Sequence, residues 1–232
     1  MAAQIYSEGK NQDSRNFQGS SAAIGLFTAA LYILNNQFIY KKGECYMTIN
    51  LPEVPTKIKT ERLLLRMPMP GDGQVVNAAI HASLDDLKPW LAFAQEEPSP
   101  QGTEINQLES HLNFLKREVL RYLIFEKETG NFIGSTGFHS IEWDVPKMEI
   151  GYWLDSNAAG KGYMIEAVSA LTDLAFATLK CNRLEIQCDA ENFKSRAIPE
   201  KLGFILEGIL KNDERSVDGK RLTDTCIYAK FA

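Results

Sequence analysis

Apolar runs the length of a β-strand alternate with segments of helical spacing along most of this chain. Residues 121–126 and 132–141 are two such runs, and the polar segment 127–131 between them, which contains glycine, is typical of a hairpin turn. Further runs predict five more strands, at residues 57–66, 147–154, 183–188, 204–210 and 221–231. Because helical segments separate several of these runs, the pattern predicts a single α/β domain with a mixed sheet.

Two of the helical segments have a well-defined apolar face. After residue 162, apolar residues recur at helical spacing at six positions: Met164, Ala167, Val168, Leu171, Leu174 and Ala175. Thr103 is expected to cap another helix, and five of its residues should lie together in the core: Ile105, Leu108, Leu112, Leu115 and Val119. Asp72 should cap a helix through about Leu84, and Pro89 limits the helical stretch at 85–93.

The first 46 residues differ from the rest of the chain. Residues 1–21 are polar, and the apolar run at 22–34 has only 13 residues, whereas a membrane-spanning helix needs roughly 20. The segment Lys41-Lys42-Gly43-Glu44 can be encoded by a purine-rich ribosome-binding sequence just before Met47. We therefore expect an extension at 1–46, upstream of a native start at Met47, and one domain at 47–232. The alternative is an added amphipathic helix that packs on the domain or on a second subunit.

Composition and charge narrow the class of protein. The chain has 232 residues with a formal net charge of −5, so it lacks the basic surplus of a nucleic-acid or anionic-membrane binder. Its four cysteines and three histidines show no spacing typical of a disulfide framework or a metal site. We expect a cytoplasmic protein with reduced thiols, no metal, no nucleic-acid partner and no membrane association.

A glycine turn joins the predicted strand at 147–154 to the helix that follows. With glycine at 160 and 162, the N–H groups of Gly160, Lys161, Gly162 and Tyr163 can approach an anion at the positive end of the helix. The turn is neither a P-loop nor a dinucleotide fingerprint, because the lysine-serine/threonine pair and the third glycine are missing. The alternative is a glycine turn that only permits a tight connection.

A pair of polar residues lies at the start of the predicted helix near residue 193. Asn192 and Ser195 are three residues apart, and Gly203 follows the helix as a C-cap. By themselves, both polar residues could act only as caps. Asn192 and Ser195 follow the glycine turn by about thirty residues. The two features in this order are a more specific signal than either one alone.

Taken together, these motifs resemble the GNAT acyltransferases of the RimJ/RimL type. The resemblance runs from about Lys57 to Phe231 and rests on Thr60-Glu61-Arg62-Leu63-Leu64-Leu65-Arg66, Glu149-Ile150-Gly151-Tyr152-Trp153-Leu154, Gly160-Lys161-Gly162-Tyr163 with Glu166-Ala167, and Asn192 and Ser195 with Lys201-Leu202-Gly203-Phe204. It implies a mixed, mostly antiparallel twisted sheet, with a splay between two parallel central strands and helices on both faces. One position departs from the family pattern, because Asn157 replaces the usual glutamine or arginine.

The resemblance implies acetyl-CoA as the cofactor. Pantetheine would pair with the open backbone edge of Tyr152, Trp153 and Leu154 as an extra strand would. The pyrophosphate would lie on the turn at 160–163, next to Asn157. Lys161, Lys194 and Arg196 are candidate phosphate contacts. Asn192 would orient the pantetheine or the Ser195 hydroxyl.

Acetyl transfer to an amine requires a proton acceptor and a proton donor. Glu149 is the first candidate for the acceptor, because a carboxylate is unexpected in this apolar strand, and His139 is the second, because it titrates near neutrality. The resemblance assigns the proton donor to Ser195, and a backbone N–H near Trp153 or Leu154 would polarise the carbonyl. A ping-pong route through Cys188 lacks an evident base, so direct transfer is favoured.

The acceptor is expected along residues 83–102, which carry Trp90, Phe93 and the acidic pair Glu96-Glu97. These carboxylates and the net negative charge suit a cationic primary amine. By resemblance the acceptor is a ribosomal-protein N-terminus. Polyamines and aminoglycosides remain alternatives, as does a non-catalytic acyl-CoA-binding module. Family members are often dimers, so a homodimer stays open.

Overall fold

The computed structural model describes residues 2–3, 37–42, 45–50 and 52–232. The chain divides into two compact units, one formed by residues 1–7 with 55–232 and the other by residues 8–54. Within the second unit, β2 (Gln37–Lys42) and β3 (Cys45–Asn50) form an antiparallel hairpin. The apolar run at 22–34 lies outside the described residues. Met47 falls inside β3, and a native start there stays a prediction.

A mixed sheet forms the centre of the larger unit. The strands run in the order β10-β11-β9-β8-β7-β6-β5-β4, and every neighbouring pair is antiparallel except β8 and β9. Their bounds are β4 (Lys57–Lys59), β5 (Leu63–Arg66), β6 (Leu120–Glu126), β7 (Phe132–Glu142), β8 (Lys147–Leu154), β9 (Arg183–Asp189), β10 (Ile205–Arg215) and β11 (Leu222–Phe231). The expected mostly antiparallel sheet with one parallel pair is confirmed.

The two parallel strands separate soon after they begin. Pairing between β8 and β9 covers three positions and ends with Glu149 opposite Glu185. We call this point the fork. Beyond it, the short strand β1 (Ala2–Ala3) pairs with Trp153 and Tyr152 of β8. The edge of β8 past the fork therefore has main-chain groups that can pair with an extended segment.

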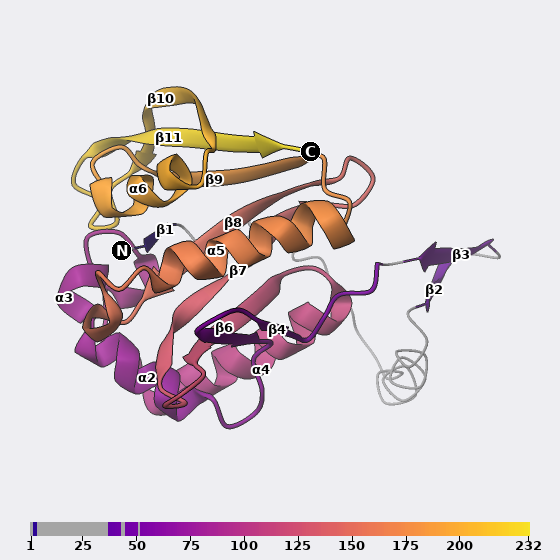
Figure 1. The fold of residues 1–232 in the computed structure, drawn as a ribbon, viewed down its shortest axis with the longest axis horizontal. Coiled ribbons are helices and arrows are strands. Elements are labelled where there is room, and N and C mark those ends of the chain that lie inside the picture. Colours follow the sequence, from indigo (N-terminus) through magenta and orange to yellow (C-terminus); the bar gives the residue numbers. More distant parts are fainter. Residues whose placement is uncertain (1, 4–36, 43–44, 51) are drawn as a thin grey trace, which may run out of the picture. The chain divides into compact units, whose positions relative to one another are not determined.

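Helices cover both faces of the sheet (Figure 1). On one side α5 contacts β5, β7 and β8, and on the other α2 contacts β7 and α4 contacts β6. The bounds are α2 (Gly73–Ala82), α3 (Leu84–Leu87), a 3₁₀ turn η2 (Ala92–Ala94), α4 (Pro100–Lys116), a 3₁₀ turn η3 (Ser156–Ala158), α5 (Tyr163–Asp173), a π turn η4 (Leu174–Thr178) and α6 (Phe193–Lys201). The six residues predicted on one face after residue 162 are all buried. Within the described ranges, no helix is long and apolar enough to cross a membrane.

The single strand predicted at 57–66 is instead a hairpin of β4 and β5. The chain turns at Thr60, whose hydroxyl accepts a hydrogen bond from the backbone N–H of Leu63 (2.9 Å) and donates one to Glu166 (2.5 Å). The turn thus depends on a carboxylate 106 positions further along the chain, so no local pattern could reveal it.

The predicted apolar face of the helix at α4 is also wrong. Ile105, Leu108 and Leu112 are 48%, 39% and 54% exposed. The buried side of α4 is largely polar and consists of Thr103, Gln107, Ser110 and Phe114. Ser99, not Thr103, caps the helix by accepting a hydrogen bond from Gly102 N (3.0 Å).

Two of the polar residues on the inner side of α4, Thr103 and Ser110, have hydrogen-bond partners, whereas Oε1 of Gln107 has none among the described residues. The hydroxyl of Thr103 accepts a hydrogen bond from the side-chain amide of Asn77 on α2 (2.9 Å). Ser110 donates to the carbonyl of Asn106 (2.7 Å), whose own side chain accepts from Arg121 on β6 (2.7 Å). These bonds offset the cost of burying polar groups and let the apolar residues face outward.

The orientation of α4 can be tested with one variant on its buried side and one on its exposed side. Phe114 is fully buried and packs edge-on against Tyr122, so Phe114→Ala should lower the free energy of unfolding by about 3–5 kcal/mol. Leu112→Gln, on the exposed side, should change it by less than about 0.5 kcal/mol. Urea unfolding followed by fluorescence measures both, and a comparable loss for the two variants would show that the outer side of α4 is covered in solution.

Candidate active site

Glu149 is the last β8 residue paired at the fork. Its side chain is only 12% exposed, and one carboxylate oxygen lies 3.8 Å from Nε2 of His139 on β7. Burial raises the pKa of Glu149 to about 8, and the negative charges of Glu185 and Glu214 add to that shift. A carboxyl group with this pKa gains and loses a proton near neutral pH, as proton-transfer chemistry requires.

His139 and Glu149 are brought together by strand register. They are directly opposite each other in the β7–β8 pair, at the point where an irregularity in β7 begins. His139 Nδ1 lies 3.2 Å from the hydroxyl of Ser140. The two proton-acceptor candidates named from the sequence therefore occupy one site rather than two.

Ser195, the candidate proton donor, is fully buried in the first turn of α6. Its hydroxyl donates to the phenol oxygen of Tyr152 (3.2 Å), and the Tyr152 hydroxyl donates to the carbonyl of Ser195 (2.9 Å). Asn192 acts as the N-cap of α6, because its side-chain oxygen accepts from Ser195 N (3.1 Å). Sequence reasoning assigned Tyr152 only a main-chain role, so this link between β8 and α6 was missed.

Cys188 on β9 lies beside Ser195 and is buried. Burial raises the pKa of its thiol to about 12, with a further contribution from Cys226. At neutral pH the group is therefore a thiol, which is a poor nucleophile. The environment of Cys188 does not suit an acetyl-cysteine route.

The glycine turn has the backbone geometry expected of an anion-binding site. Gly160 and Gly162 both have φ of 78°, in the left-handed region that favours glycine. In the described part of the chain, no hydrogen bond is found for the backbone N–H groups of 160–163, which precede or begin α5. Asn157 is turned back to its own loop, where its N–H and side-chain amide donate to Asp155 (2.9 and 3.0 Å).

The other two cations named from the sequence already have partners. Lys194 on α6 forms an ion pair with Asp86 at 3.4 Å and is exposed. Arg196 donates to the hydroxyl of Tyr228 (3.1 Å) and to the carbonyl of Ala190 (2.9 Å). Arg196 therefore links α6 to β11 and to the residue that follows β9.

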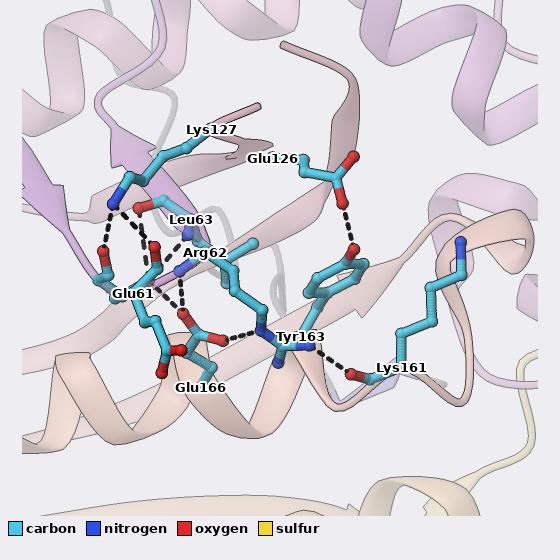
Figure 2. Close-up of polar contacts among 9 residues, drawn as sticks. Glu61, Arg62, Leu63, Glu126, Lys127, Lys161, Tyr163 and Glu166 are labelled. Atoms are coloured by element: carbon cyan, nitrogen blue, oxygen red, sulfur yellow. Dashed lines mark hydrogen bonds and ion pairs between the residues drawn. The ribbon is translucent and has the colours of Figure 1, made fainter. Parts of the chain in front are cut away.

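A network at the start of α5, which sequence reasoning did not anticipate, holds the glycine turn against the β4–β5 hairpin (Figure 2). Arg62 forms an ion pair with Glu166 at 2.7 Å and donates to the carbonyl of Lys161 (2.9 Å). Burial disfavours the charged form of Glu166, but hydrogen bonds from Thr60 and Arg62 outweigh it and hold the pKa of Glu166 below its ordinary value. The motif residues were visible in the sequence, but their contacts were not.

The expected acceptor segment borders the end of β8. The ring of Phe93 packs edge-on against Trp153, with 6.1 Å between centroids. Residues 92–93 and 95–99 line an open cavity of about 650 Å³, and Glu96 and Glu97 are among them. An acidic surface is thus placed next to the strand that carries the fork.

Comparison with known proteins identifies the family. A family model described as "Acetyltransferase (GNAT) domain" matches residues 62–205, which is more than half of the chain. The chain is 32% identical over 170 residues to the uncharacterized N-acetyltransferase p20 of Bacillus licheniformis, covering 73% of this chain and 93% of that one. It is 30% identical over 142 residues to the ribosomal-protein-serine acetyltransferase of Escherichia coli, covering 61% and 75%.

Solved structures agree with this result. A RimL ribosomal L7/L12 alpha-N-protein acetyltransferase in complex with coenzyme A superposes with a TM-score of 0.68 at 26% identity, covering 76% of this chain and 96% of that one. The microcin C7 self-immunity acetyltransferase MccE, in complex with acetyl-CoA and AMP, gives a TM-score of 0.71 at 24% identity, covering 77% and 98%, which shows the shared fold. This chain, with its forked sheet and glycine turn, belongs to the GNAT acetyltransferase family.

Proposed function

We propose that this GNAT-type N-acetyltransferase transfers the acetyl group of acetyl-CoA to the α-amine of a protein N-terminus by direct transfer. The observation that carries the proposal is the position of Glu149, a carboxyl group with a pKa of about 8 at the fork between the two parallel strands. The relative from Escherichia coli that is named for acetylation of a ribosomal-protein serine supports this acceptor class. The RimL structure supports CoA as the ligand.

The residues at the fork fit an extended, amide-rich ligand. Because β1 already pairs with Tyr152 and Trp153, pantetheine can bond to the same edge, continuing to Leu154, once it replaces β1. The N–H groups of 160–163 then receive the pyrophosphate at the start of α5. Lys161 adds positive charge, and Asn157 after β8 and Asn192 at the start of α6 are further candidate contacts. Acetyl-CoA supplies an acetyl group activated as a thioester.

Glu149 takes the proton of the acceptor amine, directly or through a water molecule. Its carboxylate form is a stronger base than an ordinary glutamate because burial has raised its pKa. His139, 3.8 Å away, is the second candidate for this step. The backbone N–H of Trp153 or Leu154 polarises the carbonyl.

Ser195 gives a proton to the departing thiolate. Tyr152 accepts a hydrogen bond from the Ser195 hydroxyl and so fixes its rotamer beside the edge of β8. Cys188 keeps its proton at neutral pH because its pKa is about 12, which favours direct transfer over a covalent acetyl-cysteine.

The acceptor approaches along residues 92–99. Phe93 joins this segment to Trp153, and Glu96 and Glu97 line its cavity, so a cationic amine is attracted. The same charge suits a polyamine or an aminoglycoside. A non-catalytic acyl-CoA-binding module is the other alternative, and the presence of both Glu149 and Ser195 beside the fork argues against it.

A panel of acceptors separates these possibilities. Release of free thiol from acetyl-CoA should be fastest with peptides that have a free α-amine. The matched control is the same peptide with a blocked N-terminus and one internal lysine, and spermidine and kanamycin complete the panel. Turnover with the small amines but not with free N-termini would contradict the protein-acceptor proposal.

Ligand binding is testable without any acceptor. Acetyl-CoA and CoA, but not ATP, should stabilise the protein in a thermal-shift titration, by about 2.7 kcal/mol at 100 times Kd. No response to either CoA species would refute both the enzyme and the binding-module proposals.

Ser195→Ala should lower kcat by about 10²-fold, the contribution of one general acid, with little change in the Kd of CoA. Stopped-flow thiol release and calorimetry measure the two quantities. Ser169→Ala on α5 is the matched control, because Ser169 lies in an ordinary helical position. Equal activity of the two variants would remove Ser195 from the mechanism.

The raised pKa of Glu149 predicts that kcat/KM depends on pH. Below its pKa of about 8 the carboxyl is protonated and cannot accept a proton, so kcat/KM should rise with pH and level off above 8. A hydrazide acceptor, which is neutral throughout this range, keeps the acceptor's own titration out of the profile. Glu149→Gln should remove this rise and lower kcat by about 10²- to 10⁴-fold.

Glu185→Gln is the companion variant for the pH experiment. It removes a negative charge that raises the pKa of Glu149, so the rise in kcat/KM should move to lower pH while activity at pH 9 is kept. An unmoved profile in both variants would show that the titrating group is not Glu149.

A further inference from the structure

The glycine turn at the start of α5 is held by residues that come about a hundred positions earlier in the sequence. Glu166, in the first turn of α5, accepts hydrogen bonds from the Thr60 hydroxyl (2.5 Å), the Arg62 backbone N–H (2.8 Å) and Arg62 Nε (2.7 Å). Lys127 donates to the carbonyls of Thr60 and Glu61, both at 2.8 Å, and so fixes the same hairpin (Figure 2). The guanidinium of Arg62 thus reaches α5 from a firmly anchored turn.

One of these contacts acts directly on the backbone of the turn. Arg62 Nη1 donates to the carbonyl of Lys161 at 2.9 Å. The C=O and N–H of a trans peptide point in opposite directions, so this bond turns the N–H of Gly162 away from Arg62. Gly162, with φ of 78°, permits that orientation without strain. The result is a backbone N–H that is free to bind a ligand.

Aromatic contacts hold Arg62 in place above the turn. Its guanidinium lies 4.7 Å from the centroid of the Tyr163 ring. The Tyr163 hydroxyl in turn donates to the carboxylate of Glu126 at the end of β6. Arg62 is 44% exposed and Glu166 only 18%, and Gly160, Lys161 and Gly162 are themselves exposed, so the pair lies beside a turn that a ligand can reach.

We propose that Arg62, held by Glu166, is a positioning residue for the diphosphate of CoA: it orients the peptide between Lys161 and Gly162 and so sets the affinity of the glycine turn. This rests on the proposed function. The positive charge of Arg62 is already neutralised by Glu166, so the contribution comes from backbone orientation. Lysine carries the same charge but cannot bond to Glu166 and to the Lys161 carbonyl with one planar fork.

The experiment compares cofactors that contain or lack the diphosphate. Arg62→Lys should raise KM about tenfold for acetyl-CoA, and equally for acetyl-dephospho-CoA, which keeps the diphosphate, because charge-assisted contacts to it are weakened. With S-acetylpantetheine, which has no diphosphate, kcat/KM should stay within about twofold of the unmodified enzyme. kcat with acetyl-CoA should stay the same, because the reacting atoms lie elsewhere. Arg62→Gln repeats the test without the charge.

The controls separate this role from a purely structural one. Arg221→Lys alters another exposed arginine–glutamate pair, with Glu191 at 2.7 Å, and should leave all three KM values unchanged. Equal losses with all three cofactors, or an unchanged KM for acetyl-CoA, would overturn the proposal. Calorimetry with CoA on the unmodified enzyme comes first: absence of binding there refutes the proposed function, whereas normal binding with unaffected Arg62 variants refutes only this inference.

Discussion

The site depends on the early separation of two parallel strands. β8 and β9 pair at only three positions, the last being Glu149 with Glu185. A continuous pair would satisfy the main chain of Tyr152, Trp153 and Leu154 within the sheet and leave no edge for a ligand. The separation therefore leaves an edge of β8 in the centre of the domain that pairs with β1 here instead of with β9. It also places two carboxylates side by side, and with burial this proximity raises the pKa of Glu149.

The helices α5 and α6 bring further groups to the gap between β8 and β9. The backbone N–H groups of 160–163, at the start of α5, have no hydrogen-bond partner among the described residues, and the Arg62–Glu166 pair fixes that end of α5 from the β4–β5 hairpin. α6 brings Ser195 against Tyr152. A carboxylate, a hydroxyl and a set of amides thus gather around one strand, although they come from segments far apart in the sequence. We propose that this arrangement supplies the proton acceptor, the proton donor and the backbone amides for acyl transfer to an amine.

Periodicity predicted most of the fold because the core faces of the strands and of α5 are strongly apolar. The candidate site residues were also named from the sequence, and their roles stay predictions. Their interactions were not foreseen, because the Tyr152–Ser195 and Arg62–Lys161 bonds join distant segments. Two errors have the same origin. The β4–β5 turn relies on Glu166. The polar inner side of α4 includes Thr103, whose partner is on α2, so the most apolar side of that helix was wrongly placed in the core.

Amide hydrogen exchange with and without CoA tests whether the edge of β8 beyond the fork receives the pantetheine arm. We expect CoA to protect the amides of residues 152–154 and 160–163 together, while those of the exposed strand β10 exchange at an unchanged rate. Protection confined to other regions, with unchanged exchange at 152–154, would contradict it.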